Sequence, residues 1–269
     1  MLRGCDGGLL LLSRGRFQWE HLAVYDPFAR TAVFFRAPGG FSWVLHYALL
    51  ANDSDADADA SFRVVAVQFF NDRVEAAVFS SRTQDWSPLP SHSARRPWNA
   101  RDGVRAGRFA YWQSNNLKYN NNDKERVLVL DTISMEWSLI QVPFPVGEPY
   151  CATDMAEYGG LCLVVSKMSR LQLWVSIDGR WTMMKNVALR KQFPVLMFTK
   201  MKGLRPLAVR DDLLFMEFWT FKPRHYLLLL NLKTMKLEMV KNDSSEPYRG
   251  FYCILFAADI GFGGQFILL

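Results

Sequence analysis

Residues 127–137 read Val-Leu-Val-Leu-Asp-Thr-Ile-Ser-Met-Glu-Trp, an apolar run that ends in a polar turn and restarts at a tryptophan. A short run of Val and Leu bounded by turn residues is consistent with a buried β-strand. The Asp and Ser that follow favour a tight turn, after which Trp137 begins another strand. The segment therefore predicts a β-hairpin whose first strand is buried.

The same pattern recurs at four other places along the chain. The apolar runs are Leu22–Asp26, Ala76–Ser81, Val127–Asp131, Leu171–Ser176 and Leu227–Asn231, and the residues that restart a strand are Val33, Trp86, Trp137, Trp181 and Leu237. Successive restarts are separated by 44 to 56 residues. A repeat of about 50 residues is the length of a kelch-type propeller blade.

Each repeat also contains an earlier apolar strand. These strands are expected at residues 8–12, 62–70, 107–112, 160–165 and 213–219. Sheets that are apolar on both faces must stack against neighbouring sheets, and a closed ring leaves only short edges exposed. We therefore predict an all-β fold, a β-propeller of about five to six antiparallel blades. We expect residues 251–257 to pair near residues 8–12 and close it.

A β-sandwich is the alternative, because alternating strands and frequent turns are also typical of that fold. The fivefold period favours the propeller. We expect a single domain over residues 1–269, because propellers of this length form one unit. An acidic loop insertion at 52–60 and an Asn-rich loop at 115–123 are expected between strands, where long loops are tolerated.

The composition is that of a folded soluble protein, with 50% hydrophobic, 14% aromatic and 22% charged residues. The formal net charge of +6 favours acidic partners. The four cysteines lie far apart and follow no signal segment, so we expect free thiols and a cytoplasmic or nuclear location. The apolar segment 251–269 contains Asp259 and three glycines, and no membrane association is expected.

No motif for catalysis, a metal or a cofactor is found. The four histidines are scattered, and neither a Walker-type glycine loop nor a G-x-S-x-G nucleophile motif occurs. The acidic loop has Ala58 where a calcium loop beginning at Asp53 needs Gly, so calcium is not expected. We therefore expect a binding protein rather than an enzyme.

The candidate partner-binding residues are basic and aromatic and lie in two stretches of the chain. They are Arg95, Arg96, Trp98, Arg101, Arg105 and Tyr119 in the first stretch, and Arg190, Lys191 and Phe193 in the second. Arg and aromatic side chains are enriched among the residues that dominate binding energy in protein interfaces. Charged loop residues that only keep the protein soluble are the alternative interpretation.

Several segments resemble the C-terminal associated region of plant F-box proteins. They are Cys5–Leu12, Val24–Arg30, Ala77–Thr83 with Trp86, Val129–Thr132, Tyr158–Leu163, and Leu173–Val175 with Trp181. The resemblance implies a kelch-like substrate-recognition propeller. In the family this propeller is joined to an N-terminal F-box that docks a Skp-type adaptor of a cullin ubiquitin ligase. The chain departs from the family by starting within the first expected blade, so the adaptor is expected as a partner only where an F-box is supplied.

The expected function is recognition of a protein target with an acidic surface, as the substrate-recognition part of such a ligase. A propeller enzyme or a carbohydrate-binding, lectin-like domain is the alternative, and it would need carboxylates, His or Tyr that converge at the central channel. Nucleic acid is not expected as a partner, although the basic stretches permit it.

Overall fold

The computed structural model describes residues 2–14, 21–41, 44–51, 61–70, 73–93, 102–113, 124–145, 148–155, 160–167, 170–177, 180–189, 201–210, 213–220, 225–234 and 236–240. These residues form five four-stranded sheets in which strands that follow one another in sequence lie side by side. All the pairs whose register is known are antiparallel. Within the described part of the chain, no helix has the length and apolar character needed to cross a membrane.

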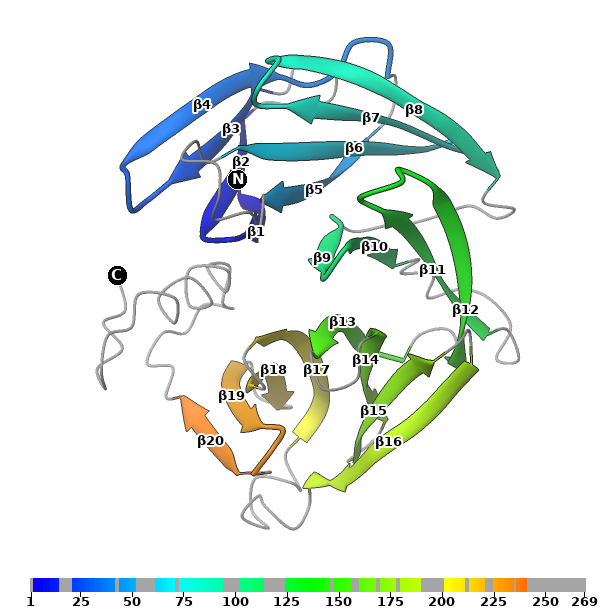
Figure 1. The fold of residues 1–269 in the computed structure, drawn as a ribbon. Helices are drawn as coiled ribbons and strands as arrows, with labels where there is room; N and C mark the ends of the chain where they lie inside the picture. Colours follow the sequence, from blue (N-terminus) through cyan, green and yellow to red (C-terminus); the bar gives the residue numbers. More distant parts are fainter. Residues whose placement is uncertain are drawn as a thin grey trace. The chain divides into compact units, whose positions relative to one another are not determined.

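The strands divide evenly among the sheets (Figure 1). The first three sheets are β1 (Leu2–Asp6), β2 (Leu9–Arg14), β3 (His21–Asp26) and β4 (Thr31–Arg36); β5 (Leu45–Ala51), β6 (Phe62–Phe70), β7 (Arg73–Ser80) and β8 (Asp85–Ser93); and β9 (Val104–Ala106), β10 (Phe109–Gln113), β11 (Lys124–Asp131) and β12 (Trp137–Pro145). The last two are β13 (Tyr150–Met155), β14 (Gly160–Lys167), β15 (Arg170–Ile177) and β16 (Arg180–Ala188); and β17 (Met201–Arg210), β18 (Leu213–Thr220), β19 (His225–Asn231) and β20 (Leu237–Val240).

The chain divides into two compact units. Among the described residues, the first unit runs to Val142 and the second from Pro143. The first unit contains the first three sheets, apart from the last three residues of β12, and the second unit contains the last two sheets. The single domain predicted over residues 1–269 stays a prediction.

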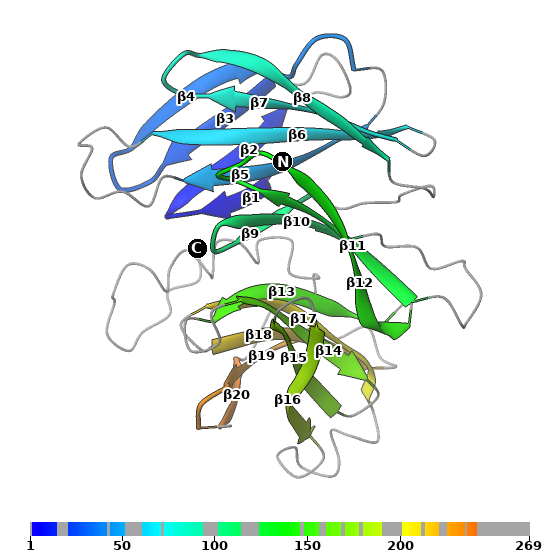
Figure 2. The same ribbon diagram turned by 45° about the vertical axis from the view of Figure 1, so that its right-hand side comes forward.

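In the first unit, the second sheet is buried on both faces (Figure 2). Val64 and Ala66 on β6 pack into a core shared with the first sheet, while Val65 and Val67 pack into a core shared with the third. Side chains alternate between the two faces of a strand, so an unbroken apolar run fills both cores. This arrangement confirms that the sheets are apolar on both faces and stack against their neighbours.

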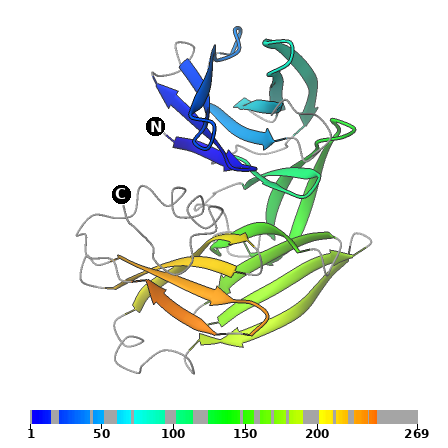
Figure 3. The same cartoon turned by 60° about the vertical axis from the view of Figure 1, so that its left-hand side comes forward.

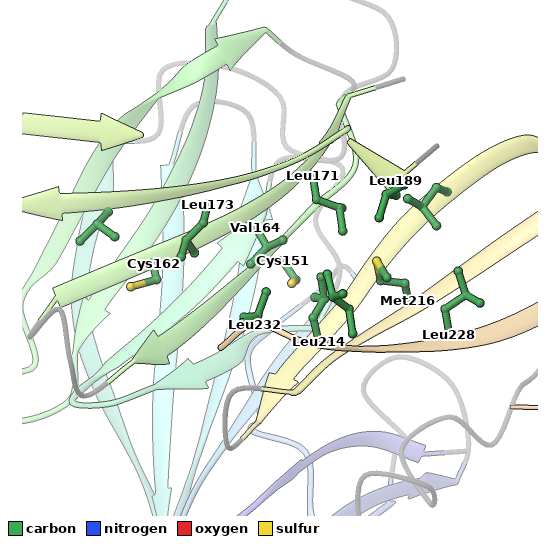
Figure 4. Close-up of a cluster of buried hydrophobic side chains, with 13 residues drawn as sticks. Cys151, Cys162, Val164, Leu171, Leu173, Leu189, Leu214, Met216, Leu228 and Leu232 are labelled. Carbon is green, nitrogen blue, oxygen red and sulfur yellow. The ribbon is translucent and has the colours of Figure 1, made fainter. Parts of the chain in front are cut away.

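The second unit has one core between its two sheets (Figures 3 and 4). Cys162, Val164 and Leu173 contribute to it from the fourth sheet, and Leu214 and Met216 from the fifth. Cys5, Cys151 and Cys162 are free thiols, as predicted. Burial raises the pKa of the Cys151 thiol to about 12, against a lowering effect of a hydrogen bond with the Val164 backbone.

The repeating hairpin between the third and fourth strands of a sheet has a common turn. In three of the sheets the turn begins at an Asp or Asn whose side-chain oxygen accepts hydrogen bonds from the backbone N–H groups two and three residues later. These acceptors are Asp26, Asp131 and Asn231. The fourth residue after the start of the turn has a positive φ at Arg30, Gln84 and Met135. These polar residues therefore fix the hairpins that the sequence predicts.

The first strands of the five sheets, β1, β5, β9, β13 and β17, were not specified by the sequence pattern, which predicts at least three strands per repeat. β2 lies between β1 and β3, so both of its hydrogen-bonding edges are filled by neighbouring strands of the N-terminal segment. Residues 251–257, which were expected to pair near this strand, lie outside the described residues. The predicted closure therefore stays a prediction.

Candidate interaction surface

Arg105 is the one predicted partner-binding residue within the part of the chain that the structure describes. It lies on β9, and its side chain is 12% exposed. The remaining candidates lie outside the described residues: Arg95, Arg96, Trp98, Arg101, Tyr119, Arg190, Lys191 and Phe193. Their role in binding stays a prediction, and so do the two loop insertions at 52–60 and 115–123.

The Arg105 guanidinium links β1, β5 and β9, the first strands of the three sheets in the first unit. Its Nη1 lies 3.0 Å from Asp6 Oδ2 on β1 and donates to the Ala51 carbonyl on β5 at 2.5 Å. Asp6 Oδ2 also accepts from the Ala51 backbone N–H at 2.7 Å. Because Arg105 is largely buried and satisfies groups of its own protein, its contacts stabilise the fold.

A second Arg–Asp pair holds the other end of β5. Arg3 Nη2 lies 3.2 Å from Asp102 Oδ1 and donates to the Leu45 carbonyl at 2.5 Å. Asp102 Oδ1 accepts from the Tyr47 backbone N–H at 2.9 Å. β5 is an edge strand of its sheet, so these two pairs satisfy backbone groups that would otherwise lack a partner strand.

The strand register brings several turns to one end of the first unit. At this end, which we call the turn end, Ala51 pairs with Phe62, Arg63 with Ser80, and Phe109 with both Ala106 and Asp131. The turn at 81–84 therefore lies beside the first residues of β6, and the turns at 107–108 and 132–136 lie at the same end of the third sheet as one another. Arg63 Nη1, 3.7 Å from Met135 Sδ, joins the two sheets at this end. Ser81 N donates to Phe62 O within the second sheet, and Thr132 N donates to Arg108 O between the two turns of the third sheet.

Arginines and one apolar side chain gather at the turn end. The Arg108 side chain is 57% exposed and pairs with the Asp131 carboxylate. Arg63 on β6 is half-buried, and its Nη1 lies 3.7 Å from Met135 Sδ in the turn of the third sheet. Ile133, in the same turn, is 74% exposed. A surface with exposed Arg and apolar side chains is suited to protein contact.

The charges at the turn end depend on the local environment. Burial and the positive charge of Arg105 lower the pKa of Arg63. At Asp131 partial burial acts to raise the pKa, but hydrogen bonds from the Ile133 N–H, the Arg108 side chain and the Ser134 N–H lower it. Asp131 is therefore a carboxylate at neutral pH, and its oxygens are committed to the turn and to Arg108.

Among the described residues, no group of three or more His, Cys, Asp or Glu side chains is arranged to hold a metal ion. His46 on β5 packs its ring 5.8 Å from the ring of Phe69. Burial, together with the charge of Arg3, lowers the pKa of His46 to about 4. The imidazole is therefore neutral at pH 7.

The sequence interpretation missed Arg63, Arg108 and Ile133. Arg63 interrupts the apolar run Phe62–Phe70 at its second residue, and Ile133 occupies a turn position where the backbone is already fixed by Asp131. A charged residue inside a buried strand and an apolar residue in a turn are both departures from the expected pattern. These two departures are the features of the sequence that could have identified Arg63 and Ile133 as candidate surface residues.

A family model described as the β-propeller of F-box protein AT5G49610-like proteins matches residues 4–252. The five four-stranded sheets are therefore blades of a propeller, in agreement with the predicted fold and with the predicted family resemblance. No curated protein matches the chain.

Solved structures of similar fold include a variant of the Aleuria aurantia lectin in complex with α-methyl-L-fucoside. It is 11% identical with a TM-score of 0.55, and the match covers 90% of this chain and 76% of the lectin. An oligogalacturonate lyase in complex with manganese is also 11% identical, with a TM-score of 0.54. This match covers 93% of this chain and 66% of the lyase. At this identity the likeness concerns the fold alone.

Proposed function

The chain belongs to the family of F-box protein AT5G49610-like β-propellers, and we propose that it is the target-recognition module of a Skp-cullin-F-box type ubiquitin ligase. The observation that carries the proposal is the family match over residues 4–252. The module needs no catalytic group of its own, because selecting a target requires only binding. Where an F-box is supplied, the bound target would be presented to the ligase through a Skp-type adaptor.

The turn end of the first unit supports this function. It combines the exposed Arg108 and the half-buried Arg63 with an exposed apolar side chain, and its backbone is held by Asp131 and by the Arg105–Asp6 pair. A rigid surface loses little conformational entropy when it binds, which favours affinity. The proposed target is a protein with an acidic surface.

Affinity capture tests the proposal. The tagged full chain, with and without an added F-box segment, is incubated with a plant extract, and bound proteins are quantified by mass spectrometry. We expect a specific target in both samples and Skp-type adaptor subunits only with the F-box. The purified target should then bind the chain saturably in calorimetry.

Two results would contradict the proposal. One is that no captured protein binds the chain when both are purified. The other is a saturable rise in thermal stability with a fucoside or an oligogalacturonate, in the absence of a protein target, which would favour the carbohydrate-binding alternative.

A further inference from the structure

Arg63 differs from its neighbouring arginines in its partners. Arg105 is paired with Asp6 and Arg108 with Asp131. Among the described residues, the contact found for the Arg63 guanidinium is with the thioether sulfur of Met135, at 3.7 Å. A thioether is a weak hydrogen-bond acceptor and carries no charge. The structure thus shows a half-buried cation without a carboxylate in the described part of the molecule.

This placement costs stability. Burial disfavours a charged group that has no opposite charge beside it, and Arg105 adds like-charge repulsion. The lowered pKa of Arg63 has the same two causes. No contact within the described part of the fold neutralises this charge. Residues that lower stability in this way are often retained for function.

Like the Arg63 charge, the Ile133 side chain is not required by the local structure. The turn at 132–136 is fixed by the Asp131 carboxylate, which accepts from the Ile133 and Ser134 backbone N–H groups. The Ile133 side chain takes no part in those bonds and is 74% exposed. Met135, in the same turn, contacts Arg63. The turn that holds the exposed Ile133 side chain is therefore the turn that contacts the Arg63 guanidinium.

We propose that Arg63 binds a carboxylate of the protein target, and that an apolar side chain of the same target segment packs on Ile133. This site rests on the proposed function, and it specifies the feature of the target that is recognised, a carboxylate beside an apolar side chain. A planar guanidinium can donate hydrogen bonds to both oxygens of a carboxylate, and an exposed Ile offers a surface for the neighbouring apolar residue to cover.

Charge favours an acidic protein segment over a nucleic acid. The guanidiniums of Arg105 and Arg108 are paired with the carboxylates of Asp6 and Asp131, whereas that of Arg63 has no carboxylate partner among the described residues. A nucleic-acid backbone needs several phosphate contacts for appreciable affinity. The two carboxylates would repel a row of phosphates, whereas a single carboxylate can pair with the Arg63 guanidinium.

Selection from a random 12-residue peptide library on the immobilised full chain tests the site. We expect the enriched peptides to carry Asp or Glu close to an apolar residue. Their affinity should fall about tenfold or more for Arg63→Gln and for Ile133→Ser, in line with the loss of a central interface residue. Arg73→Gln is the matched control, because Arg73 is an exposed arginine at the opposite end of the same sheet.

Thermal unfolding separates a binding role of Arg63 from a structural one. Arg63→Gln should unfold at the same temperature as the wild type or higher, because it removes a half-buried cation beside Arg105. Arg105→Gln should unfold at a lower temperature, because it removes the guanidinium that pairs with Asp6 and donates to the Ala51 carbonyl. Equal losses of stability in the two variants would make Arg63 structural and overturn the proposal.

The outcomes distinguish the site from the function. Peptides that bind Arg63→Gln as tightly as the wild type would overturn the site and leave the proposed function in place. Inorganic phosphate that displaces the peptides at millimolar concentration would indicate a general anion site and overturn the preference for a carboxylate. Enrichment of no peptide would count against the site, while affinity capture still tests the function.

Discussion

His46 shows how packing sets the charge of a single side chain. His46 lies on β5, its ring packs against Phe69, and Arg3 donates to the carbonyl of the preceding residue, Leu45. Burial and the charge of Arg3 lower the pKa of His46 to about 4. In the unfolded chain the pKa returns to about 6.5. Between these values the unfolded state binds more protons than the folded state, so the free energy of unfolding falls as the pH is lowered.

We predict that the wild type loses up to about 3 kcal/mol of stability through His46 as the pH falls from 6.5 to 4. Urea unfolding at a series of pH values measures this loss. The His46→Gln variant lacks the titrating group, so its stability should fall less steeply over the same range. Parallel curves for the two proteins would show that His46 keeps its ordinary pKa in the folded state.

Arg30 illustrates local backbone strain. Its φ of 55° lies in the left-handed region, which is unfavourable for a residue with a Cβ atom, and the side chain is exposed. Arg30→Gly should therefore stabilise the protein by up to about 1 kcal/mol, after the entropy cost of glycine. Arg30→Ala, which keeps the Cβ atom, is the control and should not stabilise. A lower midpoint for the glycine variant in chemical unfolding would argue against strain at this turn.

At the scale of the element, the hairpin turn is a unit that the sheets reuse. Asp131 accepts from two backbone N–H groups and pairs with Arg108, so it connects the turn of β11 and β12 to that of β9 and β10. Asp26 and Asn231 make the same backbone contacts in the first and fifth sheets. The turn therefore tolerates either Asp or Asn.

Asp131→Ala should lower the free energy of unfolding by about 1 to 2 kcal/mol, since it removes the acceptor of the turn. Asp131→Asn should lose less, because an amide oxygen still accepts from the Ile133 and Ser134 N–H groups. Because the pKa of Asp131 is lowered, its contribution should be present at neutral pH and vanish only as the pH falls below the ordinary range of a carboxyl. Calorimetry at pH 7 and at pH 3 measures both effects, and equal losses in the two variants would contradict the capping role.

The outer strands show how the sheets avoid pairing with other molecules. β8 lies at the edge of the second sheet and contains Pro88 and Pro90, which lack a backbone N–H. Trp86 on β8 donates its indole N–H to the Arg36 carbonyl on β4, which also lies at an edge. The two prolines therefore hinder the pairing of β8 with a strand of another molecule.

At the scale of the whole molecule, burial assigns different reactivity to the cysteines. Cys151 and Cys162 lie in the core of the second unit, while Cys5 on β1 is partly exposed. A thiol must ionise to react, and burial raises the pKa of Cys151 to about 12. The reactivity of these thiols should therefore report on the folded state of the second unit.

We predict that iodoacetamide at pH 8 modifies Cys5 in the native protein and leaves Cys151 and Cys162 unmodified for hours. In denaturant all three should react at similar rates. Peptide mapping by mass spectrometry gives the modified fraction at each position. Rapid native modification of Cys162 would show that the core of the second unit opens readily.

The sequence by itself determined the sheet repeat, because it depends on local chemistry. Apolar runs such as Val127–Leu130 bury both faces of a strand, and Asp131 or Asn231 fixes the turn that follows, so the second, third and fourth strands of each sheet can be read from neighbouring residues. The same runs carry the family resemblance that the family model bears out.

Only the tertiary structure decided where the charged side chains lie. Arg105 pairs with Asp6, a residue 99 positions earlier in the chain, and its predicted role in binding a partner stays a prediction. Arg63 was not among the predicted binding residues. The structure places its guanidinium beside Met135, with no carboxylate partner among the described residues. A guanidinium is committed or available according to which groups the fold brings within a few ångströms of it. Those groups come from other sheets, so no local pattern in the sequence specifies them.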